Sequence, residues 1–191
     1  MKTIEAYHPS NKEEWRMWLE VNHEKKDSIW LIFDKKSSAN PNLTWSEAVD
    51  EALCFGWIDS LKKTIDSEQY KQYFSKRKVN SIWSKTNKDK VKYLTEHNLI
   101  LEAGYKSIEI AKKNGSWSRY DDVEALIVPE DLKLEFKKYE GSKEYFESLS
   151  KSAKKILLYW IISAKRPTTR QNRIKDIAEN GSKNLKPKPF R

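Results

Sequence analysis

The sequence has one cysteine, Cys54, and five glycines among its 191 residues. A single cysteine excludes an intrachain disulfide, so nothing in the chain requires an oxidising compartment. The few glycines form neither a GxGxxG nor a GxxxxGKS/T motif, which argues against a nucleotide-driven enzyme. The sequence also lacks an apolar run of about eighteen residues and an apolar signal segment at its start. We therefore expect a cytoplasmic protein without an integral membrane segment.

Histidine is equally scarce, with three in the chain. His8, His23 and His97 lie far apart, and no cysteine or carboxylate stands at the spacing of a zinc site. We therefore expect no metal and no cofactor. His23 and His97 are placed at helix ends, where a capping or surface role is favoured over catalysis. Cys54 lies at the end of an apolar helix, where a packed thiol is favoured over a nucleophile. No residue is assigned a catalytic role.

Aromatic residues, in contrast, are abundant: the chain has eight Trp, nine Tyr and six Phe. These large rings concentrate buried area in few positions, which argues against a disordered chain even though 34% of the residues are charged. The length fits one domain, or one domain with an appendage, and excludes a multidomain machine.

The positive charge is concentrated at one end of the chain. Lys and Arg total 37 against 28 Asp and Glu, a formal net charge of +9. Residues 151–191 hold 12 basic and 2 acidic side chains, so this last fifth carries +10 and residues 1–150 carry −1. Such a block attracts phosphates, acidic lipids or acidic proteins in a salt-dependent way. The alternative is a solvated helical face followed by a frayed basic tail.

Capping signals and hydrophobic periodicity predict the elements of the first half. Ser10 with Glu13, and Thr44 with Glu47, have the spacing of a capping box that opens a helix. Gly56 is placed to end the second of these helices. The elements expected are a helix over about 11–25, a strand over 28–33, a polar loop KKSSANPN over 35–42, strands over 57–65 and 69–77 joined by a turn at Asp66–Ser67, and two helices within about 85–115.

The second half is predicted to be helical. Pro129 begins a helix that reaches Tyr139, and a strongly apolar helix precedes Pro167. Thr168 or Thr169 opens a last helix that ends at Gly181. The final segment, KNLKPKPFR, has no residues for the core and is expected to be mobile. The core contacts expected in the first two helices are Leu132, Leu134, Phe136, Ile156, Leu157, Trp160, Ile161 and Ala164.

These elements predict an α+β fold. It is mostly helical, with a small antiparallel sheet of about three strands and a helical C-terminal module. The predicted domains are an N-terminal α+β region over 1–128, the helical module over 129–183 and a basic tail over 184–191.

The densest unusual segment is EALCFGWIDS, residues 51–60. Strand alternation places Trp57, Asp59 and Leu61 on one face. A carboxylate beside a tryptophan suggests a ligand-binding site, with Arg77 and Lys78 of the neighbouring strand as counter-ions. The alternative is an ion pair between Asp59 and Arg77 at the sheet edge that fixes the strand register.

A second candidate site lies in WIISAKRPTTRQNR, residues 160–173. Arg166, Arg170 and Arg173 fall three or four residues apart, so their guanidinium groups project together and suit phosphate or carboxylate binding. Thr168 or Thr169, near the start of a helix, adds donors for an anion. The alternative is that these arginines bind acidic residues within the same fold.

At these two segments the sequence resembles the bacteriocin-protection, YdeI or OmpD-associated family. ALCFGWIDS and AKRPTTRQNRI carry the resemblance most specifically, and it extends over about residues 10–183. The chain departs from the family pattern at Lys76, where a proline is common, and near Asn98, where a glycine-rich turn is common. The resemblance implies a role in resistance to bacteriocins or cationic peptides, and it implies no particular reaction. The candidate residues are Trp57, Asp59, Arg77 and Trp83 for a ligand, and Lys165, Arg166, Thr169, Arg170 and Arg173 for an anion.

The first functional hypothesis is a non-enzymatic bacterial stress or bacteriocin-protection protein. It would bind an anionic partner, such as a phosphate-bearing ligand, a nucleic acid or an acidic protein, through the C-terminal module. One alternative is a nucleic-acid-binding protein, which fits the basic block and the aromatics but has no recognised motif. The other is a small-ligand or enzyme site, with Asp59 as acid or base and Arg77 or Arg170 as the anion holder.

Overall fold

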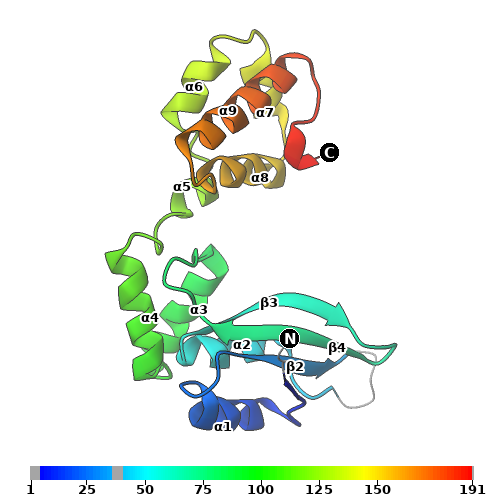
Figure 1. Cartoon of the computed structure of the whole chain (residues 1–191), viewed down its shortest axis with the longest axis vertical. Helices are drawn as coiled ribbons and strands as arrows, with labels where there is room; N and C mark the ends of the chain where they lie inside the picture. The colour runs from blue at the N-terminus through cyan, green and yellow to red at the C-terminus, as the bar shows by residue number, and fades with distance from the viewer. Residues whose placement is uncertain (1–4, 36–40, 191) are drawn as a thin grey trace. The chain divides into compact units, whose positions relative to one another are not determined.

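The computed structural model describes residues 5–35 and 41–190. The chain divides into two compact units, residues 1–118 and 119–191, called here the N-terminal unit and the C-terminal unit (Figure 1). Most of the loop expected over 35–42 falls in residues 36–40, outside the described part of the chain. Within the described ranges, no helix combines the length and hydropathy needed to cross a bilayer.

The N-terminal unit contains a mixed sheet with strand order β1-β2-β4-β3. Its strands are β1 (Ala6–Tyr7), β2 (Ser28–Asp34), β3 (Trp57–Thr64) and β4 (Gln69–Lys76). The three longer strands pair antiparallel as predicted, and β3 and β4 form the expected hairpin. The prediction of about three antiparallel strands omitted β1, which pairs parallel to β2. Two residues are too few to leave a periodic pattern in the sequence.

The described residues of the N-terminal unit also form four helices: α1 (Lys12–Asn22), α2 (Trp45–Cys54), α3 (Lys85–Glu96) and α4 (Glu102–Lys113). The capping box of Thr44 and Glu47 at the start of α2 is confirmed. The one predicted for α1 is displaced by one residue, because Asn11 rather than Ser10 is the cap and accepts a bond from the Glu14 backbone N–H. An amide oxygen caps as well as a hydroxyl, so the spacing rule alone could not choose between them.

One face of the sheet packs against α1 and α2 to form the core. Alternate residues of β2, Ile29, Leu31 and Phe33, are fully buried on this face. Trp15 of α1 joins the layers, because its ring packs edge-on against Phe74 of β4 and its Nε1 donates to the backbone oxygen of Ala48 in α2.

The C-terminal unit is helical and packs around its longest helix. Its elements are α5 (Asp121–Glu124), α6 (Glu130–Phe136), α7 (Ser142–Ser148), α8 (Lys151–Ile162), α9 (Pro167–Ser182) and a 3₁₀ turn, η1 (Lys188–Phe190). Residues 119–128, placed with the N-terminal region from the sequence, belong to this unit, since Val123 of α5 is buried in its core. The core residues are Val123, Leu132, Phe136, Phe146, Leu157, Leu158, Ile161, Ile174, Ile177 and Ala178.

Three sequence expectations for the C-terminal unit were wrong. Leu134 and Ile156 are exposed, at 50% and 46%. Leu158, which was not among the expected core residues, is buried. The final segment returns to the core: Phe190 packs against it, and the backbone N–H of Lys188 donates to Asp176. The composition of the tail gave no indication that Phe190 contacts the core.

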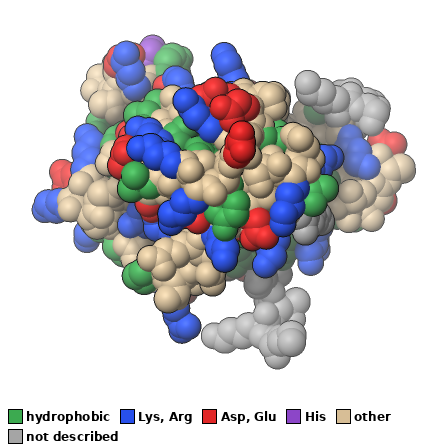
Figure 2. Space-filling model, turned by 90° about the horizontal axis from the view of Figure 1, so that it is seen from above, with side chains coloured by type: hydrophobic (Ala, Val, Ile, Leu, Met, Phe, Trp, Pro, Cys, Tyr) green, Lys and Arg blue, Asp and Glu red, His purple; other side chains and the backbone are tan. Residues whose placement is uncertain are grey.

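Charges of both signs share the surface. Lys and Arg side chains are interspersed with Asp and Glu on the face drawn in Figure 2. The positive excess is therefore not gathered into one uninterrupted patch on that face.

Candidate functional site

Three of the four predicted ligand-binding residues line one pocket of the N-terminal unit. Trp57, Arg77 and Trp83 surround a cavity of about 390 Å³, and Asp59 does not line it. This volume suits a small organic molecule. The sequence pattern predicted these residues, but it did not predict that helix α4 also lines the pocket.

The pocket exists because three backbone segments approach closely. Gly56 ends α2 with a φ of +71°, and the chain turns directly into β3. A Cβ at this position would lie 2.8 Å from the backbone oxygen of Ala103 in α4. The backbone N–H of Arg77, which follows β4, donates to the oxygen of Gly56 at 2.9 Å. Gly56 therefore joins the α2–β3 turn, the end of β4 and helix α4 at one place.

Arg77 is the central polar residue of the pocket. Its guanidinium carbon lies 3.6 Å from the centroid of the Trp83 ring, and its Nη2 donates to the backbone oxygen of Ile82 at 2.9 Å. Its Nε and Nη1 are buried and have no hydrogen-bond partner among the described residues. Burial lowers the pKa of Arg77 to about 10, against the opposing effect of the Asp59 charge. The side chain is thus still a cation at neutral pH, with donors left to satisfy.

Asp59 forms its hydrogen bonds with side chains of α2 and β4 and does not line the pocket. Its Oδ2 accepts hydrogen bonds from Trp45 Nε1 at 2.9 Å and from Gln72 Nε2 at 2.8 Å. The predicted ion pair with Arg77 is replaced by these two neutral partners, and the two charges interact only at longer range. Strand alternation also fails after Asp59, because a bulge between Asp59 and Lys62 leaves Leu61 62% exposed.

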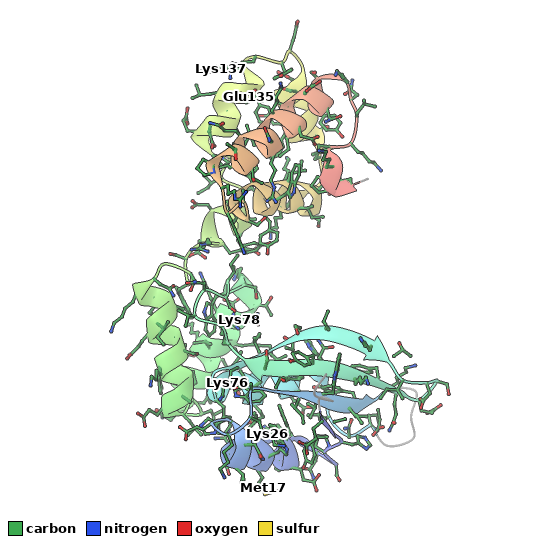
Figure 3. All side chains as sticks on the ribbon, in the orientation of Figure 1. Met17, Lys26, Lys76, Lys78, Glu135 and Lys137 are labelled. Carbon is green, nitrogen blue, oxygen red and sulfur yellow. The ribbon has the colours of Figure 1, made fainter. Side chains whose placement is uncertain are left out.

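The pocket lining is mainly basic and apolar. Lys76, Lys78 and Lys106 accompany Arg77, and Glu24 is the acidic residue of the lining. Figure 3 shows Lys76 and Lys78 at the end of β4. The Lys76 ammonium is engaged by the backbone oxygen of Glu24, at 2.8 Å, and by Asp27. The apolar walls are formed by Phe55, Trp57, Val79, Trp83 and Ile110.

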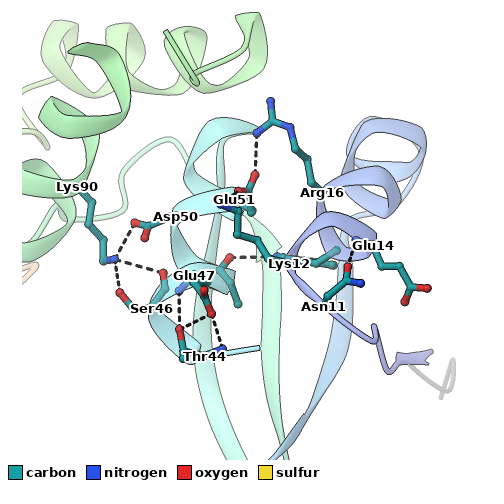
Figure 4. Close-up of polar contacts among 12 residues, drawn as sticks. Asn11, Lys12, Glu14, Arg16, Thr44, Ser46, Glu47, Asp50, Glu51 and Lys90 are labelled. Atoms are coloured by element: carbon teal, nitrogen blue, oxygen red, sulfur yellow. Dashed lines mark hydrogen bonds and ion pairs between the residues drawn. The ribbon is translucent and has the colours of Figure 1, made fainter. Parts of the chain in front are cut away.

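His23, Cys54 and Glu51, the histidine, thiol and buried carboxylate near the pocket, have structural surroundings. His23 Nδ1 bonds the backbone oxygen of Leu19 at 2.9 Å, as expected of a helix-end residue. Burial, followed by the nearby Glu51 carboxylate, raises the pKa of the Cys54 thiol to about 11. Glu51 is itself buried and binds Arg16 at 2.7 Å and Lys12 at 3.7 Å (Figure 4). A neutral, buried thiol is a poor nucleophile.

In the C-terminal unit, two of the predicted anion-binding arginines have partners within the fold. Arg170 binds Asp131 through two bonds, Nε to Oδ2 at 2.7 Å and Nη2 to Oδ1 at 3.0 Å. This contact lowers the pKa of Asp131. Arg173 donates to Ser163 Oγ at 2.9 Å and to the backbone oxygen of Trp160. The alternative, that these arginines bind acidic residues of the same fold, therefore describes Arg170, whereas Arg173 is bound by a hydroxyl and a backbone oxygen.

The remaining residues of this candidate site lie at the start of α9. Lys165 and Arg166 are exposed, with Arg166 at the cap position of the helix, and Thr169 is half-buried. The structure thus separates the predicted cluster into two engaged arginines and two exposed cations.

Two family models match the chain. Residues 7–107 match the family described as a domain of unknown function (DUF8412), and residues 125–184 match the family described as bacteriocin-protection, YdeI or OmpD-associated. The chain belongs to the DUF8412 family, and its residues 125–184 are similar to the OmpD-associated family. No curated protein and no solved structure matches it.

The boundaries of these matches refine the resemblance seen in the sequence. The resemblance is confirmed over residues 125–184, which contain α6 to α9. EALCFGWIDS instead falls in the DUF8412 domain, as do Trp57, Arg77 and Trp83. The pocket therefore belongs to a family without an assigned function.

Two features of the structure were not predicted from the sequence. Lys106 and Ile110 of α4 line the Arg77 pocket of the DUF8412 domain, and the clue was Gly104, a glycine inside a helix that permits close packing. The C-terminal unit has a pocket of about 770 Å³, bordered by Leu126 in the left-handed region at a φ of +57°. Nothing in the periodicity of this segment indicates either the cavity or the backbone conformation.

Proposed function

We propose that the DUF8412 domain binds a small organic anion with an apolar or aromatic body in the Arg77 pocket. The observation that carries this proposal is the buried guanidinium of Arg77, whose Nε and Nη1 have no partner within the described residues. An unmatched buried donor costs about 1 to 3 kcal/mol, and more when it is charged. A ligand that supplies a negative charge and acceptor oxygens would remove this cost.

The rest of the lining supports the same ligand class. The basic residues Lys78 and Lys106 favour an anion at the pocket and disfavour a cation. The side chains of Val79 and Ile110 offer an apolar surface for the body of the ligand, while the rings of Trp57 and Phe55 in the lining are almost fully buried. An inorganic anion would use the charge and leave this surface uncovered, so we expect an aromatic carboxylate or phosphate to bind more tightly.

For the whole chain, the match over residues 125–184 supports a protein of the bacteriocin-protection, YdeI or OmpD-associated type. Its molecular mechanism is proposed as ligand binding and not catalysis, because Cys54 and His23, the reactive side chains nearest the pocket, both have structural surroundings. An anionic partner for the C-terminal unit stays a second proposal. It would rest on Lys165 and Arg166, since Arg170 and Arg173 are already engaged.

The test is a titration followed at the Arg77 Nε–Hε signal by ¹⁵N-edited NMR. The probes are benzoate and phenyl phosphate, with benzyl alcohol as the neutral analogue and inorganic phosphate as the anion without an apolar body. We expect the Arg77 signal, assigned from its absence in Arg77→Lys, to shift with the two aromatic anions and with neither control at equal concentration.

The matched variants are Arg77→Met and Arg119→Met, which remove the same charge from the pocket and from an exposed position. Binding to both variants is followed at the tryptophan indole N–H signals, because Arg77→Met lacks the Arg77 signal. Arg77→Met should abolish binding of benzoate and phenyl phosphate, and Arg119→Met should leave it unchanged. Equal affinity of the two variants would refute the proposal.

A further inference from the structure

A second surface of the N-terminal unit combines aromatic and basic side chains that do not line the pocket. It lies on the face of the sheet opposite the core. Trp30 of β2 and Tyr73 of β4 are directly opposite each other in the register and alternate with the buried residues of their strands. Their ring centroids lie 5.2 Å apart with an interplanar angle of 67°, and both side chains are half-buried. The two rings form an aromatic step on a strand face that also carries Ile32 of β2.

Two lysines flank this aromatic step. Lys63 of β3 and Lys71 of β4 are cross-strand partners, so two ammonium groups face each other. Their Nζ atoms lie 5.5 Å and 5.1 Å from the centroid of the Trp30 ring. Neither makes an ion pair with a described carboxylate. Like charges directly opposite in a sheet are destabilising, and an anion between them would reverse the sign of that interaction.

We propose that this surface, defined by Trp30, Lys63, Lys71 and Tyr73, binds single-stranded nucleic acid. Aromatic rings beside a positively charged path are what such binding requires, because bases stack on the rings while the cations contact phosphates. A duplex hides its base faces, so the rings favour a single strand. The residues are separate from those of the Arg77 pocket, and the proposal does not depend on the proposed function.

The experiment is fluorescence anisotropy with a labelled oligothymidylate of about twelve nucleotides, titrated with the full chain at several salt concentrations. Lys63→Gln/Lys71→Gln should reduce the slope of log affinity against log salt by about 1.4, since each phosphate contact on a single strand contributes about 0.7. The control is Lys92→Gln/Lys113→Gln, which removes two exposed lysines of α3 and α4 and should leave the slope unchanged.

The aromatic part of the surface is tested separately. Trp30→Leu should weaken binding about tenfold, and Trp30→Phe should retain most of the affinity because a ring still stacks. Circular dichroism melting confirms that both variants are folded. A duplex of the same length should bind more weakly than the single strand.

Three outcomes would overturn the proposal. One is no binding of the single strand at low salt. Another is binding that Lys165→Gln/Arg166→Gln abolishes while the sheet variants keep it, which would place the nucleic-acid site in the C-terminal unit. The third is equal competition by inorganic polyphosphate together with no effect of Trp30→Leu, which would reduce the surface to a general polyanion contact.

Discussion

The guanidinium of Arg77 stacks on the ring of Trp83, with 3.6 Å between the guanidinium carbon and the ring centroid. This contact fixes the plane of the cation, and the oxygen of Ile82 satisfies only one of its nitrogen atoms. Stacking on an aromatic ring is worth about 0.5 to 2 kcal/mol. It therefore orients the buried charge without compensating for its removal from water.

Arg77→Met should separate stability from binding. Methionine keeps the unbranched stem in the pocket and removes a buried charge with unmatched donors, a change that is often neutral or stabilising. We expect the free energy of unfolding of the N-terminal unit to stay within about 1 kcal/mol of the wild-type value or to rise, measured by urea denaturation with tryptophan fluorescence. A loss of more than about 3 kcal/mol would mean that Arg77 holds the fold together.

Gly104→Ala should destabilise the N-terminal unit although alanine is the better helix former. Helix propensity alone predicts a gain of about 1 kcal/mol inside α4. The new Cβ, however, would lie 2.5 Å from the backbone oxygen of Cys54 and 2.9 Å from that of Leu53, and neither carbonyl can move without α2. We expect a net loss of about 2 to 3 kcal/mol.

The same denaturation experiment measures this loss, with Glu109→Ala on the exposed side of α4 as the control. The control should change the free energy of unfolding by less than about 0.5 kcal/mol. Because Ala103 and Ser107 of α4 line the pocket, Gly104→Ala should also weaken benzoate binding. A more stable Gly104→Ala variant would show that α4 packs less closely on α2 than the backbone distances indicate.

The sequence predicted the elements that have strong local signals. Thr44 and Glu47 satisfy each other's backbone within a single helical turn, so their spacing alone was sufficient. β1 could not be found in this way, because its two residues are ordered by pairing with β2, far along the chain. The bulge after Asp59 likewise depends on the register with β4, and a strict period of two placed Leu61 on the wrong face.

For the candidate sites too, residues with local signals were predicted and residues placed by tertiary packing were not. Trp57 was predicted because it lies beside Asp59 in EALCFGWIDS, Arg77 as a counter-ion on the neighbouring strand, and Trp83 through the family resemblance. Lys106 was missed because it reaches the pocket through the packing of α4, which is a tertiary relationship. The pairing of Arg170 with Asp131 also joins residues far apart in sequence, and spacing along α9 could indicate only that the arginines share a face.

Asp131→Asn should weaken the C-terminal unit slightly and in a pH-dependent manner. Asp131 joins α6 to Arg170 of α9, and this contact lowers the pKa of the carboxyl below its ordinary value of 3.8. Because both side chains are partly exposed, at 46% and 32%, solvent screening limits the expected loss to about 1 kcal/mol. A lowered pKa in the folded state gives stability that is present above pH 3.8 and is lost as the pH falls through the folded value.

Native-state hydrogen exchange of the α9 amides measures this contribution at pH 6 and near pH 3. We expect the difference between wild type and Asp131→Asn at pH 6 to shrink at the lower pH. Glu130→Gln, which removes a neighbouring acid paired within α6 to Lys133, is the control and should leave exchange in α9 unchanged. A difference that grows on acidification would contradict the assigned direction of the pKa.

Cys54 should resist alkylation in the folded protein. With a pKa of about 11, its thiolate fraction at pH 8 is only about 0.1%, and the side chain is almost fully buried. Iodoacetamide labelling followed by mass spectrometry should therefore be about a hundred times slower, or slower still, in native buffer than in urea, where the thiol is exposed and has its ordinary pKa of 9.0. Labelling at comparable rates in the two conditions would show that the end of α2 opens readily.

The same thiol predicts a loss of stability in alkaline solution. The pKa of Cys54 is raised from 9.0 to about 11 on folding, so the unfolded chain releases its proton first and the stabilising contribution disappears as the pH rises from 9 through 11. At 1.36 kcal/mol for each pH unit, the free energy of unfolding of the wild type should fall by about 2 to 3 kcal/mol relative to Cys54→Ala over this interval. Urea denaturation of both proteins at pH 8 and pH 11 measures the difference, and the comparison cancels the titration of lysines and tyrosines common to both. A constant difference would mean that the thiol titrates alike in the folded and unfolded chains, and that Cys54 is less isolated from solvent than its burial indicates.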